Sequence, residues 1–300
     1  MNVALVGLGH MGAAIGERIL EAGHALTVYN RTRSKAEPLV QRGAAVANDV
    51  ADLLVTNPVC ITVLSDDAAL EEVVTGANGL LAGAPRTSIL IDMSTVSPAS
   101  SARVATAAEA AGVRYLRAPV SGNPGVVRAG NLTIIVSGPS DVLDEAQPLL
   151  EQIGPRVYYV GEAEQARVVK LGLQVLIGGT AELLAEALVL GEAGGVERRV
   201  LLEIFGNSAI GSPFVKYKTG PLLEDDYSPT FTTKMMLKDL RLVLGFAEEA
   251  KTPLPLVSEL REVVARTIAA GYGEDDFIAV HLWLKQTAAA SSVAEEASSI

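Results

Sequence analysis

Short apolar runs alternate with helical periodicity over the first half of the chain. Residues 2–6 have the pattern of a buried strand that ends at a glycine, residues 13–22 have the period of a helix, and residues 25–29 form a second strand pattern. Further apolar runs recur at residues 60–64, 88–91, 113–116, 132–137 and 157–160. Most of them follow a helical segment, and this order is typical of a parallel sheet covered by helices. We therefore predict an α/β domain with a doubly wound sheet over residues 1–161.

The second half of the chain has helical patterns only. A proline-free segment from about residue 161 to residue 194 predicts a helix on the order of 45 Å long, at ~1.5 Å rise per residue. Further helices are predicted at residues 197–206, 213–222, 232–250, 255–271 and 275–287. We expect a long interdomain helix over residues 162–194, an all-helical domain for substrate binding and oligomerisation over residues 195–290, and a frayed tail over residues 291–300.

Two polar side chains interrupt the apolar middle of the long helix. Between residues 168 and 179, Lys170 and Gln174 are the strongly polar ones, and their spacing places them on one helix face, one turn apart. A lysine is rarely buried without a partner, so Lys170 is either a functional group or a side chain that snorkels to the surface. A membrane span is disfavoured because Glu182 and Glu186 leave no uncharged run of about 18 residues.

Composition and charge narrow the classes of function. The 300 residues are 49% hydrophobic and 20% charged, as in soluble globular proteins. The net charge of −11, without any basic run, argues against nucleic-acid binding. One cysteine and three scattered histidines exclude a disulfide scaffold and offer little to a metal site. The N-terminus has no basic leader, so we expect a cytoplasmic protein.

The first predicted strand leads directly into a glycine-rich loop, Gly7-Leu8-Gly9-His10-Met11-Gly12. In a strand–loop–helix unit, such glycines allow a tight turn, the close approach of a pyrophosphate, and close packing of helix on strand. The helix N-terminus then attracts the phosphates. A glycine turn without a ligand is the alternative. The context favours a Rossmann-type dinucleotide site, with Gly7, Gly9, His10, Met11 and Gly12 as cofactor-binding residues.

The end of the second strand indicates which dinucleotide is bound. NAD enzymes commonly have a carboxylate there that accepts hydrogen bonds from the ribose, whereas this chain has Asn30-Arg31-Thr32, followed by Arg33 and Lys35. A guanidinium can bind a 2′-phosphate through two hydrogen bonds, and no carboxylate repels it. We predict NADP, bound by Asn30, Arg31 and Thr32. A solvated basic helix start is the alternative.

Five further motifs follow in order along the chain. They are Leu64-Ser65-Asp66, Asp92-Met93-Ser94-Thr95, Ala118-Pro119-Val120-Ser121-Gly122, Lys170 with an amide four residues later, and Lys238-Asp239-Leu240. Together they resemble the β-hydroxyacid dehydrogenase family, which includes 3-hydroxyisobutyrate dehydrogenase and the glyoxylate/succinic semialdehyde reductases. The resemblance covers about residues 1–287, and the spacing is most similar to that of the glyoxylate/succinic semialdehyde reductases.

The resemblance implies roles for the matching residues. Lys170 would donate the proton when an aldehyde is reduced, because hydride transfer builds negative charge on the carbonyl oxygen. The implied cofactor contacts are Leu64, Ser65, Asp66, Thr95 and Lys238, and the implied substrate contacts are Ser121, Gly122, Asn123, Gln174, Phe231 and Asp239. Two residues depart from the family pattern beside the substrate. Relatives usually have asparagine at the position of Gln174, and they often have glycine at the position of Asn123.

These motifs predict an NADPH-dependent reductase of a small aldehyde or keto acid, with glyoxylate or succinic semialdehyde as the first substrates to test. Two alternatives stay open. An imine reductase or reductive aminase of the same superfamily would typically lack the lysine, and a non-catalytic NADP-binding interaction module would not turn over substrate. Family members form dimers or tetramers, and a helix this long cannot bury all its faces in one small domain, so we expect a homodimer or homotetramer. No metal, nucleic acid or membrane is expected.

Overall fold

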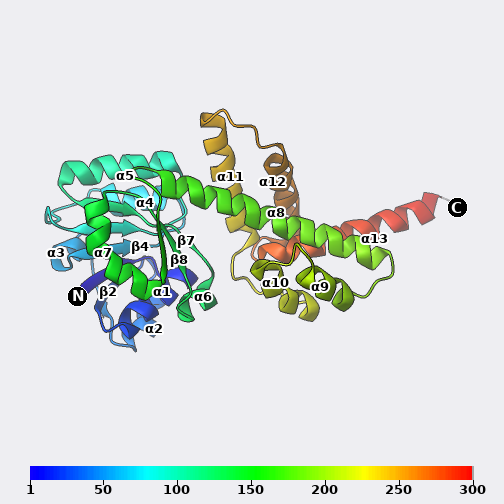
Figure 1. The fold of residues 1–300 in the computed structure, drawn as a ribbon, viewed down its shortest axis with the longest axis horizontal. Helices are drawn as coiled ribbons and strands as arrows, with labels where there is room; N and C mark the ends of the chain where they lie inside the picture. Colours follow the sequence, from blue (N-terminus) through cyan, green and yellow to red (C-terminus); the bar gives the residue numbers. More distant parts are fainter. Residues whose placement is uncertain (299–300) are drawn as a thin grey trace. The chain divides into compact units, whose positions relative to one another are not determined.

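The computed structural model describes the backbone of residues 1–298 and the side chains as far as residue 290. Its internal contacts divide the chain into two compact units, Met1–Lys170 and Leu171–Ile300. The long helix α8 (Gln165–Ala193) begins in the first unit and ends in the second (Figure 1). It is slightly shorter than the helix predicted from the sequence.

The first unit contains a six-stranded sheet in the order β3-β2-β1-β4-β5-β6, with every neighbouring pair parallel. The strands are β1 (Asn2–Val6), β2 (Ala25–Tyr29), β3 (Ala45–Val46), β4 (Val59–Thr62), β5 (Ile89–Asp92) and β6 (Arg114–Arg117). Strands β4 and β5 are buried throughout, because helices cover both faces of the sheet. The strand order reverses between β1 and β4, and ligands of such sheets bind at the carboxyl ends of the strands beside that point. The predicted Rossmann-type fold is confirmed.

Two hydrophobic cores lie on opposite faces of this sheet. One includes Ile15, Ile19 and Leu149, and the other includes Leu70 and Val104. The helices of this unit before α8 are α1 (His10–Glu21), η1 (Arg33–Ala36), α2 (Glu37–Val40), α3 (Asp52–Thr56), α4 (Asp67–Thr75), α5 (Pro98–Ala111), α6 (Pro124–Arg128) and α7 (Ser140–Ile153). Most apolar runs of the sequence therefore correspond to strands of the sheet, and the helical patterns between them correspond to the helices packed on its two faces.

The last strands of the first unit form a separate three-stranded sheet in the order β7-β8-β9. Strand β7 (Val120–Ser121) runs antiparallel to β8 (Thr133–Val136), and β9 (Arg156–Tyr159) runs parallel to β8. Pro119 separates β6 from β7 and has no N–H to continue a ladder. The apolar runs at residues 132–137 and 157–160 therefore belong to the predicted domain but lie outside its main sheet.

The second unit is helical over the residues that the structure describes, in agreement with the sequence. After α8 come α9 (Arg198–Asn207), α10 (Pro213–Glu224), α11 (Thr233–Glu249), α12 (Pro255–Thr267), η2 (Ile268–Tyr272), η3 (Phe277–Ala279) and α13 (Val280–Ser298). Ser212 and Thr232 cap α10 and α11 by accepting hydrogen bonds from Val215 N and Met235 N. The backbone of the predicted tail is helical as far as Ser298, and residues 299 and 300 lie outside the described part.

Helix α8 is long and apolar enough to cross a membrane by length and composition alone, a test that core helices of soluble proteins also pass. Arg167, Gln174 and Glu182 are each buried along it. Polar and ionisable side chains are rare and costly in a bilayer. These three side chains therefore favour a core helix over a membrane span.

Candidate functional site

The glycine-rich loop has the backbone that the fingerprint requires. Gly7 has φ +94°, and a Cβ at this position would lie 2.2 Å from Val63 O. A Cβ at Gly12 would lie 1.9 Å from Gly7 O, so neither position accepts a side chain. Gly9 differs, because a Cβ there would meet no atom within 4 Å. It is the N-cap of α1 and provides no side-chain cap, so open space and uncapped N–H groups coincide, as a pyrophosphate requires.

Asn30 braces this loop from the end of β2. Its Oδ1 accepts a hydrogen bond from Leu8 N at 2.9 Å, and its Nδ2 donates to Thr32 O at 2.9 Å. These contacts lie within the protein, so the side chain shapes both the phosphate loop and the basic loop that follows. Arg31 and Thr32 are exposed, and Arg33 donates to Asn48 Oδ1 at 3.1 Å. The loop thus presents two guanidinium groups where the sequence predicts the 2′-phosphate of NADP.

The loops after β4 and β5 lie at the same sheet edge as the glycine-rich loop, because β1, β4 and β5 are parallel neighbours. Ser94 Oγ accepts a hydrogen bond from Leu64 N at 2.8 Å and so joins the two loops. Asp66 caps α4, accepting from Ala69 N at 2.9 Å and from Ser65 Oγ at 2.7 Å. The structure therefore brings the predicted residues Leu64, Ser65, Asp66 and Thr95 to one edge of the sheet.

The predicted carboxylate-binding turn follows β7. Ser121 is half-buried, and Gly122 has φ +147°, where a Cβ would lie 3.0 Å from the side chains of Leu132 and Val126. Asn123 is the N-cap of α6, and its Oδ1 accepts a hydrogen bond from Val126 N at 3.0 Å. The asparagine that departs from the family pattern therefore has a structural role, since it caps a helix that begins with proline.

Gln174 on α8 reaches α11 in the second unit. Both Gln174 and Asp239 are almost fully buried, and Gln174 Nε2 donates a hydrogen bond to the Asp239 carboxylate. Lys238 Nζ lies 2.8 Å from Asp239 Oδ1. Three predicted site residues thus form one cluster. The extra methylene of glutamine is used to reach an acid on a neighbouring helix.

Phe231, shortly before α11, and Lys170, on α8, are two other predicted site residues. Phe231 packs edge-on against Phe277, with ring centroids 5.8 Å apart, and its carbonyl accepts from Phe277 N at 3.1 Å. Lys170 is half-buried on α8, at the last position of the first unit.

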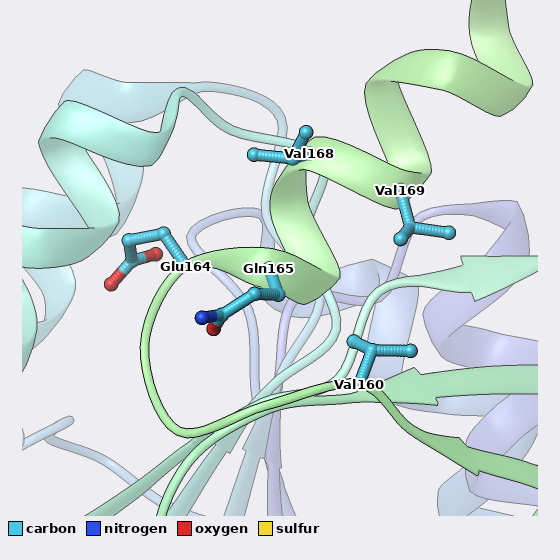
Figure 2. Close-up of a pocket in the computed structure, with 5 residues that line it drawn as sticks. All are labelled: Val160, Glu164, Gln165, Val168 and Val169. Atoms are coloured by element: carbon cyan, nitrogen blue, oxygen red, sulfur yellow. The ribbon is translucent and has the colours of Figure 1, made fainter.

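A shallow hollow of about 470 Å³ lies where β9 leads into α8 (Figure 2). Its lining residues are Val160, Glu164, Gln165, Val168 and Val169. Figure 2 shows Val160 beside the end of the strand and Val169 on helix α8. None of the predicted site residues is in this lining, so it is not assigned to the substrate.

A buried ion pair was missed by the sequence reasoning. Asp92 at the end of β5 is fully buried, and Arg167 in the first turn of α8 is 1% exposed. Arg167 donates to the Asp92 carboxylate, to Ser94 O at 2.8 Å and to Tyr115 OH at 3.0 Å. Burial lowers the pKa of Arg167, but Asp92 and Tyr115 raise it above its ordinary value, so the guanidinium stays charged. Asp92 stood in a recognised motif, yet nothing local in the sequence indicated its partner.

Known proteins match both units. Residues 2–161 match the NAD-binding domain of 6-phosphogluconate dehydrogenase, and residues 165–284 match the NAD-binding region of NADP-dependent 3-hydroxyisobutyrate dehydrogenase. The chain belongs to the 3-hydroxyisobutyrate dehydrogenase-like family of oxidoreductases. Glyoxylate/succinic semialdehyde reductase 1 of Arabidopsis thaliana is 32% identical over 93% of this chain and 97% of its own length.

Solved structures of this oxidoreductase family agree. A 3-hydroxyisobutyrate dehydrogenase from Salmonella typhimurium has a TM-score of 0.86 at 26% identity, covering 94% of this chain and 99% of that one. A reductive aminase from Aspergillus terreus, solved with NADPH and ethyl levulinate, has a TM-score of 0.62 at 25% identity, with the same coverage of both chains. The predicted family, enzyme class and nicotinamide cofactor are confirmed. The role of each site residue stays a prediction.

Proposed function

We propose that this chain is an NADPH-dependent reductase that converts a small aldehyde or keto acid to the hydroxy acid, with Lys170 as the general acid. Lys170 carries the proposal, since it stands on α8 in a chain that also has the glycine fingerprint and the Ser121-Gly122 turn. The similarity over nearly full length to a glyoxylate/succinic semialdehyde reductase supports glyoxylate or succinic semialdehyde as the substrate class.

The chemistry divides between cofactor and protein. NADPH supplies the hydride when it is bound. The Lys170 ammonium stabilises the developing charge on the carbonyl oxygen and donates the proton. The Ser121 hydroxyl and the Gly122 N–H bind the substrate carboxylate. Gln174, whose amide donates to Asp239 within the second unit, is the residue that we propose to tune substrate choice, because it departs from the family pattern.

Steady-state assays of Lys170→Ala test the role of the lysine. We expect turnover to fall by about 100-fold or more, within the range for loss of a general acid, while the Kd for NADPH changes little. Lys216→Ala, which removes an exposed lysine from α10, is the matched control. Unchanged turnover in Lys170→Ala would refute the mechanism. A panel of oxoacids and aldehydes, run with NADPH and with NADH, identifies the substrate and the cofactor preference.

A reductive aminase is the second candidate, because a protein of that activity has a similar fold and because Gln174 departs from the family pattern. Faster turnover of a ketone with an amine than of any oxoacid would favour it. A non-catalytic NADP-binding module is the third. This third candidate would be supported if the protein oxidised NADPH with no aldehyde, oxoacid or imine in the substrate panel.

We further propose that the enzyme is a cytoplasmic homodimer or homotetramer. Leucines at a seven-residue spacing on α8 support this proposal, because Leu176, Leu183 and Leu190 are 66%, 67% and 77% exposed in the single chain. Large apolar side chains that share one helix face in this way are typical of a subunit contact.

A further inference from the structure

Asp92 is the centre of a buried polar network at the carboxyl end of β5. Its Oδ1 accepts hydrogen bonds from Thr62 Oγ1 at 2.6 Å, from Ser94 Oγ at 2.5 Å and from Ser94 N at 3.2 Å. Its other oxygen accepts from Arg167. One carboxylate therefore joins the end of β4, the loop after β5 and the first turn of α8.

Arg167 completes the network from α8. In addition to the bond with Asp92, it donates to Ser94 O at 2.8 Å, to Ser101 Oγ of α5 at 3.1 Å and to Tyr115 OH of β6 at 3.0 Å. A planar guanidinium with several fixed partners allows little rotation or sliding of the turn that carries it. The first turn of α8 is thus locked to the sheet.

The network also reaches both loops that the cofactor is expected to contact. Ser94 Oγ donates to Asp92 and accepts from Leu64 N, and Thr95 is the next residue in the chain. Lys170 follows Arg167 by three residues, which is about 4.5 Å along the helix and nearly the same helix face. A shift of the Arg167 turn therefore moves Lys170 relative to the Leu64 and Thr95 loops.

We propose that Arg167 and Asp92 are positioning residues, which hold Lys170 in register with the Ser94–Thr95 loop. The inference rests on the proposed role of Lys170. Its physical basis is that a misplacement of a catalytic group by about 1 Å can lower the rate by about 100-fold. A pair with a purely structural role would instead change stability and leave turnover intact.

The test compares two buried pairs near the start of α8. Arg167→Met/Asp92→Asn removes both charges together and so avoids leaving a single buried charge. Arg117→Met/Glu164→Gln is the matched control. Arg117 ends β6, Glu164 directly precedes α8, and among the residues that the structure describes neither side chain forms a hydrogen bond with Asp92, Ser94 or Leu64. Arg167→Lys keeps the charge but cannot contact Asp92 and Ser94 O as a fork.

For Arg167→Met/Asp92→Asn we expect kcat to fall about 10- to 100-fold, with KM for the aldehyde and Kd for NADPH within about threefold of the original enzyme. The solvent deuterium isotope effect on kcat should rise, because proton transfer from a displaced Lys170 becomes slower. Arg167→Lys should show a smaller loss of kcat, and the control pair should stay within about twofold.

Either of two results would overturn the proposal. One is a folded double variant with kcat and isotope effect unchanged, and the other is an equal loss in the control pair. If the double variant does not fold, Arg167→Lys decides, and unchanged kcat and isotope effect in it refute the proposal. Lys170→Ala distinguishes failure of the proposed function from failure of the positioning role. If Lys170→Ala keeps full activity, the proposed function itself is refuted. If Lys170→Ala is inactive while the double variant has normal activity, only the positioning role is refuted.

Discussion

Glu182 is a buried acid on α8 whose charge we expect to destabilise the protein. Its side chain is 8% exposed, and neither carboxylate oxygen has a hydrogen-bond partner in the part of the chain that the structure describes. Burial raises the pKa of Glu182 from its ordinary 4.5 to about 7, and the charge of Glu186 one turn later adds to the increase. The perturbation we choose is Glu182→Gln, which keeps the shape of the side chain and removes the charge.

The sign of the effect follows from proton binding. Between pH 4.5 and about 7 the folded protein holds the proton on Glu182 and the unfolded chain has lost it, so the free energy of unfolding falls as pH rises through this window. The full shift corresponds to about 3 kcal/mol, and partial access to solvent reduces this to about 2 kcal/mol. Glu182→Gln should therefore be more stable than the original protein by about 2 kcal/mol near pH 8 and nearly equal near pH 5.

Urea denaturation of both proteins at several pH values from about 5 to about 8 measures this difference. The control is Glu203→Gln, which removes an exposed acid from α9 and should change the free energy of unfolding by less than about 0.5 kcal/mol. The reasoning is refuted if both proteins have the same pH dependence, or if Glu182→Gln is the less stable one near pH 8. Either result would mean that the carboxylate is stabilised in its charged form.

Three further predictions concern the cofactor, the substrate pocket and the assembly. Arg31→Ala should raise the Kd for NADPH about tenfold or more and leave the Kd for NADH nearly unchanged, as measured by calorimetry. Gln174→Asn should lose the hydrogen bond to Asp239, lower the free energy of unfolding by about 2 kcal/mol and change the ratio of kcat/KM between short and long oxoacids, measured by denaturation and by steady-state kinetics. Leu183→Asp should convert the oligomer to a smaller species in light scattering, and a monomeric mass for the original chain would contradict the proposed assembly.

The fold was predictable where each element carries its own pattern. The fully buried strands β4 and β5 appear in the sequence as apolar runs, and the glycine loop marks the start of α1. Strands β3 and β7 have two residues each, which is too short for any periodicity to register. The division into two sheets was equally hidden, because strand pairing between β6, β7 and β8 is decided by tertiary contacts.

The sequence predicted which segments form the candidate site, but it did not predict the hydrogen-bond partners of individual side chains. Asn30 and Asn123 were assigned to ligands, yet their side chains bond to the Leu8 and Val126 backbone N–H groups. An asparagine serves a ligand and a cap equally well, so residue type alone does not separate these roles. The order Asn123-Pro124 was a readable cap signal. Arg167 and Asp92 are 75 residues apart in the chain, and no local pattern could pair them.

Three polar side chains in the first three turns of α8 lie on one face of the helix, and two of them bind buried carboxylates. Arg167, Lys170 and Gln174 follow a spacing of three and then four residues, which keeps them on one face of the helix. Arg167 is tied to Asp92 within the first unit, and Gln174 is tied to Asp239 within the second. The turn that carries Lys170 therefore lies between two anchored turns of one helix. If Lys170 is the proton donor, the accuracy with which its turn of the helix is held depends on both the Arg167–Asp92 and the Gln174–Asp239 contact. A lysine between two buried polar residues at helical spacing is then a better indicator of function than any of the three alone.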